Sequence, residues 1–121
     1  MRDEIENEVQ TKGLTAPRVT PADIEGEIAS EHYFTAADGA IHASGGYAEE
    51  VRAGIPQPLH LLTFCVLVLR NGFTVTGESA CASPENFDAE LGRKIARQKA
   101  VEKVWPLLGF RLRDHLAGAG R

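Results

Sequence analysis

The stretch that decides the fold is Phe64-Cys-Val-Leu-Val-Leu-Arg-Asn-Gly-Phe-Thr-Val-Thr-Gly-Glu-Ser-Ala-Cys81. Two runs rich in β-branched and aromatic residues flank the pair Asn71-Gly72. Asn-Gly in this setting is a strong hairpin signal, because a two-residue type I′ turn needs positive φ at both positions. The stretch therefore predicts strands over about Leu61–Arg70 and Phe73–Ser79, joined by a tight turn.

A two-residue turn also sets which side chains share a face. It places Leu69 opposite Thr74 and Val68 opposite Val75. The core face is then predicted to carry Phe64, Val66, Val68, Phe73 and Val75. The other face carries Leu67 and Leu69, whose exposure would forgo about 1.5–3 kcal/mol each. We therefore expect a helix or a second copy of the chain to cover these two leucines, which makes them the candidate interface of a homo-oligomer.

Helix signals stand on both sides of the hairpin. Thr20-Pro21-Ala22-Asp23 is a capping box with proline at the first helical position, and it predicts a short helix ending near His32. A short strand over 33–35 follows. Ser83-Pro84 begins a turn, and the main helix is predicted over 87–105, where Pro106 ends it. Its apolar stripe is Phe87, Leu91 and Ile95, and its row of small residues is Gly92, Ala96 and Ala100.

These elements predict an α+β fold of the order helix, three-stranded antiparallel sheet and long C-terminal helix packed on one face (αβββα-like). Residues 1–19 are polar and acidic and are predicted to be a mobile arm. Residues 20–116 form a single domain, and 117–121 a frayed tail. Residues 36–59 are predicted to be mostly loop, with a short helix at about 47–53. We interpret Gly77 as a strand bulge.

Charge is unevenly distributed along the 121 residues. The net charge is −4, yet residues 93–121 hold eight Lys or Arg against two Asp or Glu. Such a cationic segment on an acidic body can attract an anionic ligand or the acidic part of a second copy. No apolar run is long enough for a membrane span, no secretory signal is visible, and two cysteines suit a reducing cytoplasm.

The side chains that usually carry chemistry form no catalytic pattern. His32, His42, His60 and His115 show no metal-ligand spacing, so no metal site or cofactor is predicted. The cysteines at 65 and 81 are typical of buried, inert thiols. We therefore expect a protein that is not an enzyme.

One resemblance is to the double-stranded-RNA-binding domain. Pro58-Leu59-His60 is similar to the loop with which that family enters the minor groove. Arg93-Lys94-Ile95-Ala96-Arg97 resembles its basic helix start, which contacts phosphates. The pattern departs at Gln57, where the family usually has glycine, and at the apparent insertion 83–91. This resemblance implies duplex nucleic-acid binding through His60, Arg93, Lys94 and Arg97.

A longer resemblance is to a small family of tailed-phage and prophage proteins, named after gene 49 of one phage and gene 66 of another. It is carried by three runs: Glu31-His-Tyr-Phe-Thr-Ala-Ala37, the stretch from Leu61 to Arg97, and Trp105-Pro-Leu-Leu-Gly-Phe-Arg-Leu112. The stretch 38–58 is longer than is usual there. The resemblance implies an accessory protein made in the cytoplasm of a bacterial host, with no assigned catalytic residues.

Two functional hypotheses remain open at this point. The first is a non-enzymatic accessory protein that binds a host protein or an anionic small molecule through Arg93, Lys94 and Arg97, with antagonism of a bacterial defence system as its role. The alternative is the duplex nucleic-acid binder.

Overall fold

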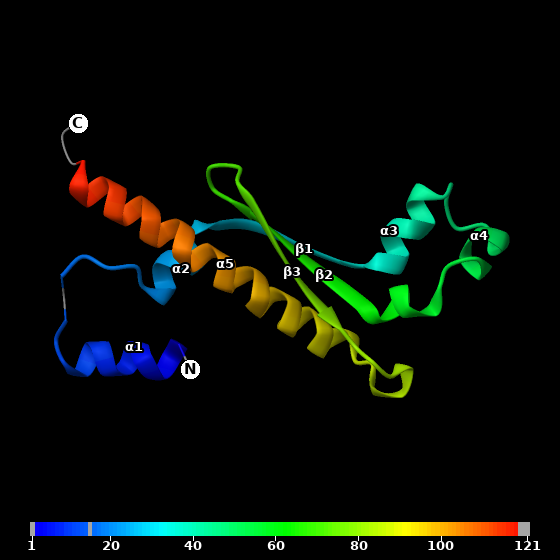
Figure 1. Ribbon diagram of the computed structural model, residues 1–121, viewed down its shortest axis with the longest axis horizontal. Coiled ribbons are helices and arrows are strands. Elements are labelled where there is room, and N and C mark those ends of the chain that lie inside the picture. The colour runs from blue at the N-terminus through cyan, green and yellow to red at the C-terminus, as the bar shows by residue number, and fades with distance from the viewer. Residues whose placement is uncertain (1, 15, 119–121) are drawn as a thin grey trace.

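The computed structural model describes residues 2–14 and 16–118, which form an elongated molecule around one three-stranded sheet (Figure 1). The strands are β1 (Ile28–Thr35), β2 (Leu62–Leu69) and β3 (Thr74–Ala80), antiparallel and in the order β1-β2-β3. The long helix α5 (Ala89–Ala117) crosses one face of the sheet and contacts β2 and β3. The predicted α+β architecture is confirmed.

The hairpin is present, but its turn is longer than predicted. The amide of Leu69 donates to the Phe73 carbonyl at 2.8 Å, and the amide of Gly72 donates to the Leu69 carbonyl at 2.9 Å. Gly72 has φ of 89°, whereas no non-glycine residue of the described chain has positive φ. The loop is therefore a three-residue type, a turn closed by one left-handed glycine, rather than type I′.

This extra loop residue reverses the predicted faces of β2. Leu67, not Val68, lies opposite Val75, and a shift of one residue moves every side chain to the other face of a strand. The buried face carries Cys65, Leu67, Leu69 and Val75, while Phe64, Val66 and Val68 lie on the half-buried opposite face and Phe73 is exposed. The predicted core face was wrong for β2, whereas Val75 of β3 is buried as predicted.

Helix α5 covers the buried face through small residues. A Cβ atom at Gly77 would lie 2.2 Å from the Ala96 carbonyl oxygen and 2.4 Å from the Ala100 amide nitrogen. Gly77 is thus a point of backbone contact between strand and helix, and the pairing of β2 with β3 continues past it without the expected bulge. The buried row is Gly92, Ala96, Ala100, Val104 and Leu108. The small-residue row was correctly predicted, whereas the stripe of Phe87, Leu91 and Ile95 is partly or fully exposed.

Pro106 lies inside α5 and does not end it, contrary to the prediction. Proline removes one intrahelical hydrogen bond, a cost of about 3 kcal/mol. Val104 and Leu108 are buried on either side of it, and the helix reaches Ala117. Tertiary packing on both sides therefore outweighs the local penalty.

The N-terminal elements follow the predicted start signal but not the predicted end. Helix α2 (Pro21–Glu27) has the capping box of Thr20 and Asp23. The chain then enters β1 at Ile28, so His32 lies in a strand and not at a helix end. The predicted helix end was wrong because β1 pairs with β2, a strand that lies far away in the sequence.

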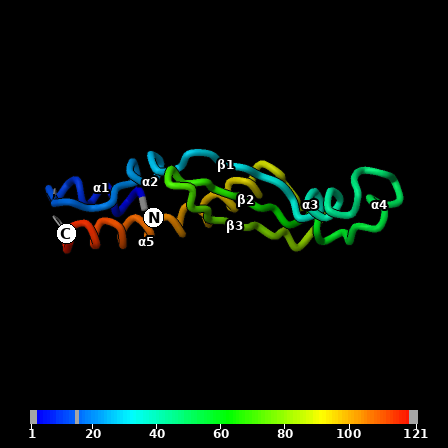
Figure 2. Tube along the Cα trace, turned by 90° about the horizontal axis from the view of Figure 1, so that it is seen from above, coloured from blue at the N-terminus to red at the C-terminus, as the bar shows by residue number. Residues whose placement is uncertain are grey.

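Residues 36–59 hold more structure than predicted. They contain α3 (Ala36–Ala43), α4 (Glu49–Ala53) and most of the 3-10 turn η1 (Gln57–Leu61). The expected short helix corresponds to α4. Helix α3 was missed although Thr35 and Asp38 form a second capping box at its start. These elements lie at one end of the molecule (Figure 2).

The segment 1–19, predicted to be a mobile arm, contains the helix α1 (Arg2–Thr11), which was not predicted. Helix α1 lies at the same end of the molecule as the end of α5, opposite α4 (Figure 2). A second 3-10 turn, η2 (Pro84–Asn86), precedes α5, whose N-cap is Asp88. At the C-terminus, 117 still belongs to α5, and residues 119–121 of the expected tail lie outside the described residues.

Candidate functional site

Arg97, one of the predicted anion-facing residues, forms ion pairs with two carboxylates of its own chain. Its guanidinium lies 2.8 Å from Glu25 of α2 and 3.0 Å from Glu31 of β1. The hydrogen bonds with Glu25 and Glu31 raise the pKa of Arg97 above its ordinary value, although partial burial of the guanidinium acts in the opposite direction. Arg97 therefore joins α5 to α2 and β1, and its charge is already neutralised.

The same cluster continues into the sheet. The Tyr33 hydroxyl donates to Glu31 at 2.9 Å. Burial and this hydrogen bond raise the pKa of Tyr33. Burial likewise raises the pKa of the Cys65 thiol, which is fully covered. Because the thiolate is the reactive form of cysteine, Cys65 is not suited to act as a nucleophile.

The other predicted site residues are Arg93 and Lys94, beside Arg97 in α5, and His60. Lys94 is 3.4 Å from Glu90, one turn earlier on the same helix. Arg93 borders a depression of about 170 Å³ with Tyr33, Phe34 and Asp38, which none of Lys94, Arg97 or His60 borders in the described chain. His60 lies in η1. That these four residues form one binding site stays a prediction.

The predicted oligomer interface is buried inside the single chain. Leu67 and Leu69 are 0% and 3% exposed in the single chain. They belong to the core beneath α5, so their burial needs no second copy.

A larger concave region lies between α2 and the C-terminal half of α5. This α2–α5 cleft has a volume of about 500 Å³, within the range typical of small-molecule sites. Its apolar wall is formed by Val19, Leu108 and Leu112, and its polar residues are Arg18, Asp23, Glu27, Arg111 and His115.

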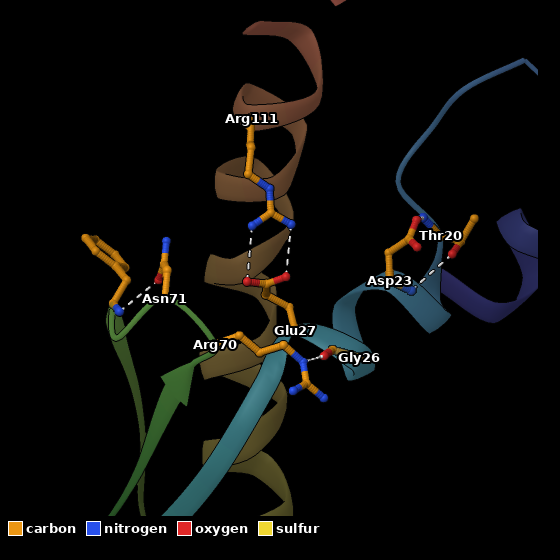
Figure 3. Close-up of polar contacts among 8 residues, drawn as sticks. Thr20, Asp23, Gly26, Glu27, Arg70, Asn71 and Arg111 are labelled. Atoms are coloured by element: carbon orange, nitrogen blue, oxygen red, sulfur yellow. Dashed lines mark hydrogen bonds and ion pairs between the residues drawn. The ribbon is translucent and has the colours of Figure 1, made fainter. Parts of the chain in front are cut away.

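Glu27 and Arg111 form the central ion pair of the cleft (Figure 3). Both guanidinium nitrogens of Arg111 donate to the carboxylate, at 2.9 and 3.1 Å. This pair holds the pKa of Glu27 below its usual value of 4.5, against the opposing effect of burial. The Arg70 side chain donates to the Gly26 carbonyl beside it (Figure 3), so the hairpin loop supports the end of α2.

Arg18 forms a second bidentate pair, with Glu6 of α1, at 2.7 and 2.9 Å. A guanidinium has five N–H donors, and Arg18 and Arg111 each use two in these pairs. Their remaining donors can serve a ligand without breaking either pair. The cleft therefore combines an apolar wall with two oriented cationic groups.

Metal sites and membrane spans are both absent from the described part of the chain. No group of three or more His, Cys, Asp and Glu side chains there could hold a metal ion. None of the helices described has the length and apolar character required to cross a bilayer.

Comparison with known protein families shows to which family this chain belongs. The family described as "Phage protein (N4 Gp49/phage Sf6 gene 66) family" matches residues 19–116. The chain belongs to this phage family. The match begins at Val19 on the wall of the α2–α5 cleft and includes all of α2 and nearly all of α5. No curated protein and no solved structure matches the chain.

The sequence analysis missed the cleft because its walls come from distant segments. Arg111 and Glu27 are 84 residues apart, and Pro106 hides the continuity of α5. The one signal in the sequence was the spacing of Leu108, Leu112 and His115, which places them along one side of a continuous helix.

Proposed function

We propose that this phage-family protein acts by binding a small molecule with an apolar body and an anionic group in the α2–α5 cleft. The observation that carries the proposal is the coincidence of an apolar wall with Arg18 and Arg111 in one concavity of about 500 Å³. Largely apolar pockets with a few convergent polar groups are the usual form of small-molecule sites.

Hydrogen-bonding capacity favours an acceptor group on the ligand, because the guanidinium groups of Arg18 and Arg111 keep donors that their carboxylate partners do not use. Asp23 accepts the amide of Thr20 at 2.9 Å, and Glu27 is engaged by Arg111, so both acids in the cleft are already in use. The N–H donors of Arg18 and Arg111 that these pairs leave unused favour a ligand group such as a carboxylate or a sulfonate.

Family membership supports a role inside an infected bacterium. We propose that the protein works in the cytoplasm of the host as a phage accessory protein, without catalysing a reaction. We further propose that the protein binds a component of the host and thereby antagonises a bacterial defence system. Duplex nucleic-acid binding is less well supported, because Arg97 is paired with Glu25 and Glu31.

Anilinonaphthalene sulfonate tests the cleft directly, because this dye carries one sulfonate on an apolar ring system and fluoresces when it leaves water. We expect saturable binding to the folded protein at one site. Leu112→Glu, which adds a negative charge to the wall, should weaken binding at least about tenfold, as expected for the loss of one well-placed contact. Leu91→Glu, on an exposed part of α5 outside the cleft, is the matched control.

Two results would contradict the proposal. One is no fluorescence enhancement with the folded protein. The other is equal loss of binding in Leu112→Glu and Leu91→Glu, which would place the dye elsewhere. Circular dichroism of each variant separates loss of the site from loss of the fold.

A further inference from the structure

Helix α1 precedes the segment that the family match covers, yet it reaches the α2–α5 cleft. The match begins at Val19, so both α1 and Arg18 lie before it. Arg18 donates two hydrogen bonds to the Glu6 carboxylate of α1, at 2.7 and 2.9 Å, and it also borders the cleft. An element outside the matched segment therefore contacts a side chain of the proposed binding site.

The C-terminal end of α1 explains how this helix comes to lie against the residues that follow it. The amide of Gly13 donates to the Gln10 carbonyl at 3.1 Å, and the amide of Leu14 donates to the Val9 carbonyl at 3.2 Å. Gly13 has φ of 67°. These features form a Schellman motif, which ends a helix at a left-handed glycine. The chain changes direction there, and a residue in the middle of α1 contacts a residue 12 positions later.

The Glu6 carboxylate is held in a defined position. The Glu6 side chain is 22% exposed and that of Arg18 is 27% exposed. Gln10 donates a further hydrogen bond to the same carboxylate at 2.9 Å. The hydrogen bonds from Arg18 and Gln10 hold the pKa of Glu6 below its ordinary value, so Glu6 is ionised at neutral pH. A carboxylate that accepts two parallel bonds from a guanidinium fixes the plane of that group.

We propose that Glu6 is a positioning residue of the α2–α5 cleft, which holds the Arg18 guanidinium in place to donate to the acceptor group of the ligand. This inference rests on the proposed function of the cleft. Ordering a long, flexible side chain during binding costs free energy, and the pair with Glu6 meets this cost before the ligand arrives. The N–H donors that the pair does not use remain for the ligand.

Orientation and charge predict opposite effects for the loss of Glu6. Removal of a negative charge near the cleft would by itself favour an anionic ligand, whereas loss of orientation weakens binding. Glu8 offers a matched control, because it belongs to the same helix and pairs with Lys12 one turn later, at 2.9 Å. Glu6→Gln and Glu8→Gln change the net charge equally, and only the first removes the partner of Arg18.

Two dyes with the same ring system distinguish positioning from a merely structural role. Anilinonaphthalene sulfonate carries an acceptor for Arg18, whereas N-phenyl-1-naphthylamine lacks the sulfonate and is neutral. In fluorescence titrations of the full chain, we expect Glu6→Gln to weaken binding of the sulfonate dye on the order of fivefold. Binding of the neutral dye should stay unchanged, and Glu8→Gln should alter neither affinity.

A double variant tests whether Glu6 acts through Arg18. Arg18→Gln should also weaken binding of the sulfonate dye. Adding Glu6→Gln in that background should have no further effect, because the group that Glu6 positions is already gone. A further loss in the double variant would contradict the proposal.

The remaining outcomes separate this inference from the proposed function of the cleft. If Leu112→Glu weakens binding of the sulfonate dye but Glu6→Gln leaves it unchanged or tightens it, the role of Glu6 is overturned and the cleft stands. Equal weakening of both dyes by Glu6→Gln would show that Glu6 only supports the fold. A wild type that binds neither dye would contradict both proposals.

Discussion

The two halves of α5 are held to the rest of the molecule by different means. Before Pro106, the helix lies backbone to backbone on β3, at Gly77, Ala96 and Ala100. After Pro106, it is held by buried Leu108 and by the ion pair of Arg111 with Glu27. Only the second half borders the α2–α5 cleft.

This difference separates the part that defines the fold from the part that can bind. Close packing of small residues leaves no space for a ligand between α5 and the sheet at Gly77 and tolerates no added atom there. An ion pair beside a few leucines leaves both space and free hydrogen-bond donors. The following predictions test whether the two halves behave this differently.

Gly77→Ala should have the largest effect. Its Cβ atom would meet the backbone of Ala96 and Ala100, so α5 must move away from the sheet, at a cost of about 3 kcal/mol or more in the free energy of unfolding. Urea denaturation followed by circular dichroism measures this. Gly26→Ala, which has no atom within 4 Å of its new Cβ, is the control. Equal stability of Gly77→Ala and wild type would show that the contact is loose.

Pro106→Ala should stabilise the protein by about 2 kcal/mol, because it restores an amide and improves helix propensity between the two halves. Thermal unfolding should show a higher midpoint. Pro84→Ala is the matched control, since proline at the start of η2 costs no hydrogen bond. A lower midpoint for Pro106→Ala would mean that the second half of α5 depends on the proline.

Glu27→Gln should have the smallest effect, about 1 kcal/mol, as expected for a partly exposed ion pair. The pKa of Glu27 is lowered in the folded protein, so this contribution is present above its unfolded pKa and is lost as the pH falls through its folded pKa. The stability difference between wild type and Glu27→Gln should therefore be constant near neutral pH and shrink below about pH 4.5. A difference that grows on acidification would contradict the ion pair, and Glu4→Gln in α1 is the control.

Local signals in the sequence predicted several elements correctly. The capping box at Thr20 and the small-residue row of α5 are both present. The position of the hairpin turn is also correct. These features depend on residues within about one helical turn or one loop of each other, which is the range over which capping and turn chemistry act.

Other predictions were wrong because distant contacts decided them. A single extra loop residue at Arg70–Gly72 moved the side chains of β2 to the faces opposite those predicted. Pairing with β2 drew residues 28–32 into β1, and burial of Val104 and Leu108 carried α5 through Pro106. In each case a long-range contact outweighed a local preference.

The amino-acid sequence alone determined where α2 begins and where the hairpin turns, that the chain forms an α+β domain, and which phage family it resembles. Only the tertiary structure decided which face of the hairpin is buried, that Arg97 is neutralised, and that Val19, Leu108 and Arg111 enclose a cleft. The physical reason is that caps and turns are short-range, whereas strand register, ion pairing and concave surfaces depend on residues that meet only when the chain is folded.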